Sequence, residues 1–312
     1  MIVAAFAAVY VIWGSTYLAI RFAIETLPPL LMAGIRFVIA GAMLYAWMRV
    51  RGARRPTRSE WLGATVVGAL LLLGGNGLVV WSEQRVPSGM TALLVATVPL
   101  WMVLMTWLRP NGTRPTAMVA TGVALGLAGL AILVQPSTIM GGGAIDPLGA
   151  LVLLIASLSW AAGSLYSRQA TMPPSPLLAT AMEMLAGGAL LILAGALTGE
   201  WSQLSLGAVS TRSVVALTYL VLFGSLVGFT AYVWLLRVAN PTHVSTYAYV
   251  NPVIAVFLGW ALADEPITPR TLVAAAIIVA AVGLITAGQT SARVPARARH
   301  AGVRVAASST DS

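Results

Sequence analysis

Ten apolar runs of membrane-spanning length set the limits on what this chain can fold into. They cover residues 2–22, 30–48, 61–82, 88–108, 116–135, 147–167, 176–197, 213–236, 242–263 and 271–288. Each holds about the twenty residues that cross a hydrocarbon core of roughly 30 Å. A backbone in lipid must satisfy its hydrogen bonds within one segment, and these runs are too long and irregular for barrel strands. The sequence therefore predicts an all-α integral membrane protein with ten transmembrane helices.

Composition supports a lipid environment. The chain is 59% hydrophobic and only 9% charged, whereas an ordinary soluble domain is about a quarter charged. So few charges cannot cover a water-facing surface, and lipid is the natural place for the excess apolar side chains.

Missing residue types exclude several classes of chemistry. The chain has no cysteine and no lysine, and its two histidines are His243 and His300. Disulfides, thiolate chemistry and a P-loop lysine are thereby excluded, and a histidine metal cluster is not expected. We predict no cofactor and no metal.

Arginine placement predicts the orientation in the membrane. Five arginines crowd residues 49–58, two lie at 109 and 114, and four lie in the tail between 293 and 304. The alternate connections are poor in arginine, so the positive-inside rule places both termini in the cytoplasm. The basic tail, residues 289–312, is predicted to be disordered, and no nucleic acid partner is expected.

A weak internal repeat is the most informative pattern in the chain. At one offset Trp13, Arg21 and Arg36 match Trp160, Arg168 and Glu183, and at a slightly larger one Gly75, Trp81, Pro99 and Trp107 match Gly228, Trp234, Pro252 and Trp260. The chain thus divides into two five-helix units, residues 1–135 and 147–288. Because five is odd, the second unit is inverted relative to the first, as in many secondary transporters.

Several segments also resemble a known family. They are IWGSTYLAIRFAIE, IRFVIAGAMLY, TALLVATVPLWMVLM and STYAYVNPVIAVFLGWALADEPIT. In order and spacing they are similar to the EamA-type family of the drug/metabolite transporter superfamily, over nearly all of residues 2–288. The resemblance implies a ten-helix fold and secondary transport, often export of metabolites, amino acids or drugs. The family's acidic residue after the ninth span is matched by Glu265, but the first copy, LRPNGTRPT, has none.

The first span carries polar and aromatic residues near its middle, namely Trp13, Ser15, Thr16 and Tyr17. Because aromatic side chains usually sit at the interfaces, we interpret this group as a wall of a substrate cavity. The alternative is a helix-packing site in which the hydroxyls bond to their own backbone.

Arg36 and Glu183 are the deepest ionisable residues in the spans. Such groups are costly in lipid, which favours substrate binding for both and proton coupling for Glu183. A structural ion pair or snorkelling is the alternative. Arg21, Glu83 and Arg168 lie near helix ends, where snorkelling explains them more simply, and Glu265 is expected in a loop.

Four further residues are candidates. Asn76 and Asn251 are polar groups inside spans that either bind substrate or bridge helices, whereas Pro99 and Pro252 are expected to kink the fourth and ninth spans as hinges. The G-x-x-x-G spacings at Gly122 and Gly224 are explained by packing within the monomer, and a homodimer stays open.

The leading hypothesis is a secondary active transporter of the cell membrane that exports small metabolites, amino acids or drug-like compounds by alternating access. An uptake permease or exchanger for an anionic metabolite, with Arg36 as the anion site, is the alternative. A membrane-embedded enzyme is the third hypothesis, for which the sequence offers no catalytic constellation.

Overall fold

The computed structural model describes residues 2–110, 112, 114–134, 146–238 and 247–291. The helices are α1 Ile2–Ala23, α2 Pro29–Val50, α3 Arg58–Gly68, η1 Ala69–Gly77, α4 Leu78–Ser82, α5 Ser88–Val95, α6 Val98–Trp107, α7 Ala117–Val134, α8 Pro147–Ser167, α9 Pro176–Leu197, α10 Glu200–Gln203, η2 Leu206–Ala208, α11 Thr211–Tyr219, η3 Leu220–Val227, α12 Gly228–Val238, α14 Tyr247–Ala263 and α15 Pro269–Ser291. Eight continuous helical stretches are long and apolar enough to span a membrane, and Ala117–Leu133 and Val250–Ala263 are shorter apolar helices. The all-α membrane fold is confirmed, and the eight spans together with the two shorter apolar helices match the predicted set of ten.

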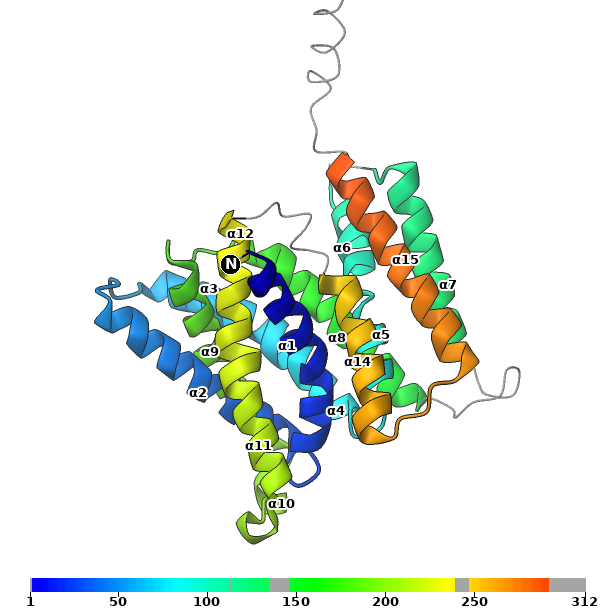
Figure 1. Ribbon diagram of the computed structural model, residues 1–312. Coiled ribbons are helices and arrows are strands. Elements are labelled where there is room, and N and C mark those ends of the chain that lie inside the picture. Colours follow the sequence, from blue (N-terminus) through cyan, green and yellow to red (C-terminus); the bar gives the residue numbers. More distant parts are fainter. Residues whose placement is uncertain (1, 111, 113, 135–145, 239–246, 292–312) are drawn as a thin grey trace, which may run out of the picture.

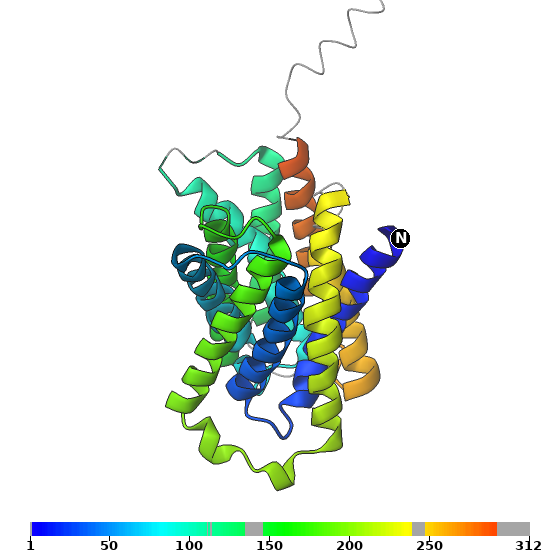
Figure 2. The ribbon, with the colours of Figure 1, turned by 90° about the vertical axis from the view of Figure 1, so that its left-hand side faces the viewer.

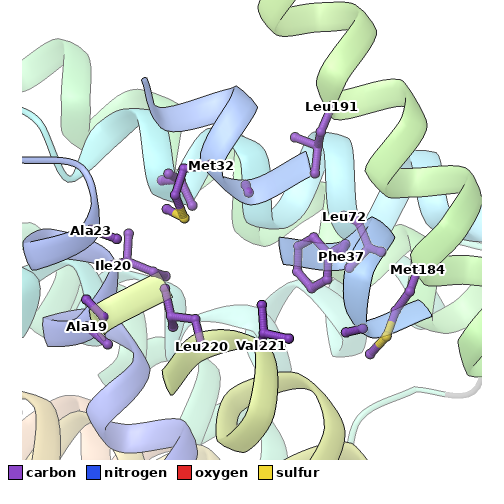
Figure 3. Close-up of a cluster of buried hydrophobic side chains, with 14 residues drawn as sticks. Ala19, Ile20, Ala23, Met32, Phe37, Leu72, Met184, Leu191, Leu220 and Val221 are labelled. Carbon is purple, nitrogen blue, oxygen red and sulfur yellow. The ribbon is translucent and has the colours of Figure 1, made fainter. Parts of the chain in front are cut away.

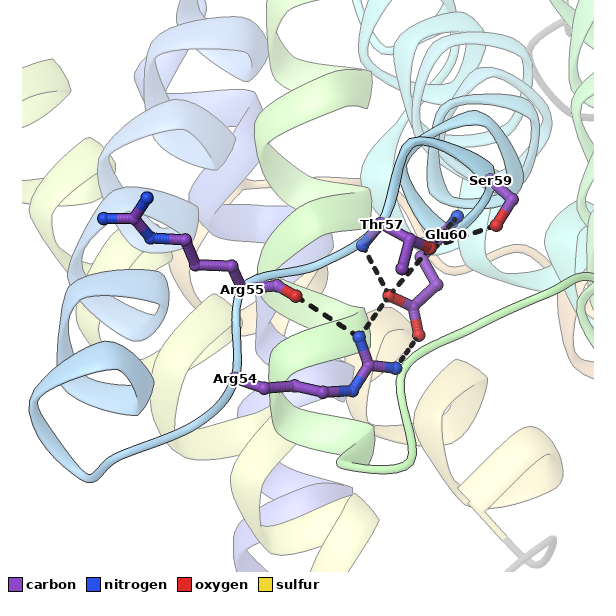
Figure 4. A network of polar contacts seen from close by, with 5 residues as sticks. All are labelled: Arg54, Arg55, Thr57, Ser59 and Glu60. Atoms are coloured by element: carbon purple, nitrogen blue, oxygen red, sulfur yellow. Dashed lines mark hydrogen bonds and ion pairs between the residues drawn. The ribbon is translucent and has the colours of Figure 1, made fainter.

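Helix starts follow from local capping chemistry. Thr57 and Glu60 form a reciprocal capping box at the start of α3, and Arg54 pairs with the Glu60 carboxylate (Figure 4). Asp146 accepts a hydrogen bond from Leu148 N at the start of α8. Its hydrogen bond from the Arg85 guanidinium also lowers the pKa of the Asp146 carboxyl. These caps explain why the predicted boundaries fall within a few residues of the observed ones.

Three spans are irregular helices. The third (α3, η1, α4) and the eighth (α11, η3, α12) each contain a π-helical segment near the middle, a feature often found at functional sites. The fourth span is interrupted between α5 and α6, and Pro99 lies in the first turn of α6. Pro252 lies inside α14. Pro252 therefore removes one hydrogen bond inside α14, whereas Pro99 starts α6 after the interruption at residues 96–97. The role of both prolines as hinges stays a prediction.

The ten spans pack as one elongated bundle. α2 packs along α9, α7 along α15 and α5 along α14, and α1 and α8 connect these groups. Figure 1 shows α2 and α9 on one side of the bundle and α7 and α15 on the other. In Figure 2, α10 lies at one end of the bundle and the last turn of α15 at the opposite end.

The largest buried cluster joins the first half of the chain (residues 2–134) to the second half (residues 146–291). Figure 3 shows side chains from α1, α2, α9 and the π-helical segments meeting there, including Ile20, Phe37, Leu72 and Leu220. Phe37 is 1% exposed and Leu220 is fully buried. The two halves therefore share a hydrophobic core.

Glycines set the distance between α2 and α9. A Cβ atom built on Gly34 would lie 2.6 Å from Ile192 Cγ1 and 2.9 Å from the Ile192 backbone nitrogen. One built on Gly188 would lie 2.9 Å from the Val38 nitrogen. Small residues let helices approach closely in membranes, where dispersion rather than the hydrophobic effect drives packing. The same reasoning explains Gly122, which faces Ile285 of α15, as a packing glycine within the monomer.

The matched tryptophans and glycines of the repeat contact each other across the halves. A Cβ on Gly228 would lie 2.5 Å from Trp13 Nε1, and a Cβ on Gly75 would lie 2.8 Å from Trp160 Cε3. Trp13 and Trp160 are repeat partners, and so are Gly228 and Gly75. In each case a tryptophan of one half packs against a glycine of the other half, so the same contact occurs twice with the two halves exchanged.

Two carboxylates cap helices of the opposite half. Glu200, just after α9, accepts hydrogen bonds from Leu30 N (3.2 Å) and Leu31 N (2.9 Å) at the start of α2. Glu265, just after α14, accepts hydrogen bonds from Ser88 N (2.7 Å) and Gly89 N (3.0 Å) at the start of α5. Both therefore fill donors that a helix start leaves open.

Contacts at the helix ends also show the relative direction of the helices that pack together. Because α9 ends where α2 begins, and α14 ends where α5 begins, each pair is antiparallel. Arg270 in the first turn of α15 donates to the Ile132 and Leu133 carbonyls at the end of α7, so this pair is antiparallel too. We call the end of the bundle formed by residues 24–28, 83–87, 198–210 and 264–268 the capped end.

A Gly34→Ala variant tests the α2–α9 contact. The added methyl group collides with backbone atoms that cannot move aside, and we expect a loss of about 1–3 kcal/mol of stability. The measurement is the apparent melting temperature of the detergent-purified protein. Gly283→Ala is the matched control, because a Cβ there meets nothing within 4 Å, and an equal change in both variants would contradict the prediction.

Glu200→Ala and Glu265→Ala test the carboxylate caps. Each leaves two helix N–H groups without an acceptor, for which we expect about 1–3 kcal/mol of destabilisation. Thermal unfolding measures it. Glu25→Ala is the control, since Glu25 is 38% exposed and pairs only with the exposed Arg212; capping variants as stable as this control would refute the assignment.

Candidate functional site

Arg36 lies deep in the bundle on α2, where it faces the π-helical segment η3. Its side chain is buried, 4% exposed. Nε donates to Ser225 Oγ at 3.0 Å, whereas Nη1 is buried without a hydrogen-bond partner. The absence of a side chain at Gly224 makes room for the other guanidinium nitrogen, because a Cβ there would lie 3.2 Å from Arg36 Nη2. Arg36 is thus a buried cation with unused donor capacity.

Glu83 is the second buried ionisable group of this site. It directly follows α4, is completely buried, and neither carboxylate oxygen has a hydrogen-bond partner. Arg36, Arg21 and Glu265 all act on it electrostatically. No ion pair within 4.0 Å joins Glu83 to any arginine of the described residues. The site therefore holds a guanidinium and a carboxyl group that do not pair with each other by direct contact.

The prediction that Glu83 snorkels at a helix end is wrong. Its side chain points into the protein and is 0% exposed. The neighbouring Arg21 is exposed, and its Nη1 donates to the backbone carbonyl of Glu83 at 2.7 Å. No local sequence signal separates Glu83 from a snorkelling residue, because its burial depends on the helices that cover this helix end.

Trp13, Ser15 and Thr16 attach α1 to the eighth span. Trp13 Nε1 donates to Gly224 O at 3.2 Å, and Ser15 Oγ lies 2.6 Å from the Tyr219 hydroxyl. The hydroxyls of Ser15 and Thr16 also donate to the backbone of α1 itself. These contacts fit the packing alternative for the hydroxyls, while their place in a substrate cavity stays a prediction.

An aromatic cluster surrounds the Trp13 indole. Ring centroids of Phe229, Tyr232 and Tyr247 lie 5.4, 5.1 and 5.2 Å from that of Trp13, in the range of favourable aromatic pairs. Tyr17, one turn further along α1, interacts electrostatically with Glu83. Thus α1 carries both Trp13, at the centre of the aromatic cluster, and Tyr17, which interacts with Glu83.

The other candidates do not join the charged site. Glu183 on α9 is half-buried and has no hydrogen-bond or ion-pair partner among the described residues, and it does not contact Arg36. Asn76 lies in η1 with its side-chain oxygen buried and unpaired. With the amide nitrogen of Asn251 placed toward the Tyr247 and Tyr10 carbonyls, it donates to both. Asn251 thereby bridges α14 to α1.

The site offers hydrogen-bonding groups to a small solute. The described residues contain no group of three or more His, Cys, Asp or Glu side chains that could hold a metal ion. The free Nη1 donor of Arg36 and the unpaired carboxyl group of Glu83 can bind charged or polar groups of a small solute.

Comparison with known proteins identifies the fold and the family. The model of the EamA-like transporter family matches residues 1–135 and 147–287. The inner membrane transporter YedA of Escherichia coli K12 is 43% identical over 284 residues, covering 90% of this chain and 89% of its own. The Bacillus subtilis transporter YoaV is 25% identical over 287 residues, covering 89% and 94%. A solved crystal structure aligns with a TM-score of 0.62 at 21% identity over 90% of this chain and 95% of its own, which shows the fold. The chain belongs to the EamA-like transporter family.

Proposed function

We propose that this membrane transporter is a secondary active carrier that exports a small metabolite, amino acid or drug-like compound across the inner membrane. The observation that carries the proposal is the pair Arg36 and Glu83, a buried guanidinium and a buried carboxyl group, each with unused hydrogen-bonding capacity. Isolated charges in a membrane interior are costly and mark solute pathways. The name of the 43% identical relative, an inner membrane transporter, supports the location.

The contacts between the halves support alternating access. Besides the exchanged tryptophan contacts, a Cβ on Gly224 would lie 3.1 Å from Thr16 Cγ2, and one on Gly163 would lie 2.8 Å from Leu71 Cδ2. Thr16 and Gly163 are repeat partners. Two antiparallel units with interchangeable contacts are the basis on which inverted repeats alternate between two states. We therefore assign residues 1–135 and 147–288 as the two moving units.

In this mechanism Arg36 binds substrate. Its free Nη1 donor offers a charge-assisted hydrogen bond to a carboxylate or another acceptor on the solute. Trp13, at the centre of the aromatic cluster, lies on the same helix as Thr16, which borders the Gly224 segment beside Arg36. Trp13, Ser15, Thr16, Tyr17, Asn76, Glu183 and Asn251 stay candidates for the rest of the solute site.

The alternative is an uptake permease or exchanger for an anionic metabolite. The same free donor of Arg36 favours it, because an anion would complete the guanidinium's hydrogen bonding. Direction of transport distinguishes the two. A membrane-embedded enzyme is a third reading, and turnover of any solute by the purified protein would favour it over both carriers.

The test combines a binding screen with vesicle transport. Purified protein is screened by thermal shift against amino acids, organic acids, organic cations and nucleosides. Compounds that stabilise it are then followed, in radiolabelled form, into inside-out and right-side-out membrane vesicles. Accumulation in energised inside-out vesicles is expected for an exporter. Accumulation only in right-side-out vesicles would replace export by uptake, and the absence of transport in either would refute the carrier proposal.

Arg36→Gln tests the site itself. Losing a charge-assisted hydrogen bond of about 1.5–3 kcal/mol is expected to weaken solute binding roughly tenfold to a hundredfold. The measurement is the concentration of solute that half-saturates transport. Arg58→Gln is the matched control, since Arg58 is exposed in the first turn of α3. Equal affinities in both variants would remove Arg36 from the binding site.

A further inference from the structure

Glu83 differs from every other acidic residue in the described part of the chain. Five of the others have a fixed partner: Glu25 pairs with Arg212, Glu60 with Arg54 and Asp146 with Arg85, and Glu200 and Glu265 cap helices. Asp264 is exposed, and Glu183 is half-buried. Only Glu83 in this part of the chain is a fully buried carboxyl group with both oxygens unpaired.

An ionised carboxylate cannot stay in such a place without compensation. Removing its hydration without supplying hydrogen bonds is expensive, and binding a proton is the simplest way to remove the charge. The structure holds no donor against either Glu83 oxygen. In the conformation seen here the carboxyl group is therefore in the environment of the neutral, protonated form.

The charges around Glu83 explain how its proton could be exchanged. The groups that interact with it electrostatically are Tyr17 and Arg21 on α1, Arg36 on α2, and Glu265 in the segment after α14. The Glu265 carboxylate accepts two hydrogen bonds from the start of α5. A negative charge on Glu265 disfavours a second negative charge on the neighbouring Glu83. Arg36 and Arg21 have the opposite effect, because either would stabilise the carboxylate if it moved into contact.

Neither arginine makes that contact here. Arg36 Nε is bound to Ser225 of the second half, and Arg21 Nη1 is bound to the backbone of Glu83 rather than to its carboxylate. A movement of the second half that releases Arg36 from Ser225 would free the guanidinium to approach Glu83. Proton release from Glu83 and rearrangement of the halves would then favour each other.

We propose that Glu83 is the proton-coupling site of this carrier, protonated in the conformation seen here and ionised when Arg36 or Arg21 moves into contact with it. The step is a simple exchange: the carboxylate takes a proton from water on one side of the membrane and returns it to water on the other. The proposal rests on the proposed function of secondary active transport. It moves the coupling role from Glu183, which is half-buried on α9, to the end of the third span.

Infrared difference spectroscopy tests the proposal without any substrate. The full chain in lipid nanodiscs is titrated from acid to alkaline pH, and the C=O stretch of protonated carboxyl groups is followed. With only nine acidic residues in the chain, the bands of single residues can be separated by mutation. We expect a protonated-carboxyl band that titrates in the wild type, is lost in Glu83→Gln and is kept in the control Glu25→Gln.

Two further variants keep the test decisive if Glu83→Gln does not fold. Glu83→Asp keeps a carboxyl group and should keep a titrating band. Arg36→Gln should move the titration to higher pH, because removing a positive charge favours the neutral acid.

The opposite results would overturn the proposal. They are an unchanged band in Glu83→Gln, loss of the band in Glu183→Gln instead, the absence of any titrating carboxyl band in the wild type, or a titration that Arg36→Gln leaves in place. Because the titration needs no transport, its failure is distinguishable from failure of the vesicle assay, which tests the proposed function alone.

Discussion

Lipid supplies no hydrogen-bond partner to a peptide group, and the structure of this protein depends on that constraint. Each span must close its own backbone hydrogen bonds, so every described element is helical. The same constraint acts at helix ends, where open N–H groups would lie at the membrane boundary. Glu200 and Glu265 fill such donors on helices of the opposite half. Helix capping and association of the halves are thus one interaction at the capped end.

Within the bundle, close backbone contact replaces the hydrophobic effect as the source of specificity. Gly34 and Gly188 bring α2 and α9 together, and Gly75 and Gly228 accept the tryptophans of the opposite half. Such contacts are strong only at short range, so a small rotation of one half removes many at once. This property suits the proposed alternating-access mechanism, in which two well-packed states must interconvert.

The charged site combines stable and unstable features. Arg36 is anchored through one nitrogen on Ser225, but another nitrogen and the whole Glu83 carboxyl group lack partners. A fold that needed these charges only for stability would pair them directly, as it pairs Arg54 with Glu60 at the start of α3. Because the two groups are not paired in this bundle, the proposed function assigns them a solute and a proton as partners.

The sequence by itself determined the number of spans, their bounds to within a few residues and the family, because these follow from hydrophobic length, capping residues and ordered short motifs. It also singled out Arg36, whose depth along a helix is visible in one dimension. Only the tertiary structure decided that Glu83 is buried and that both of its carboxyl oxygens lack a partner. Burial at a helix end depends on which neighbouring helices cover that end, and no local pattern of residues encodes those neighbours.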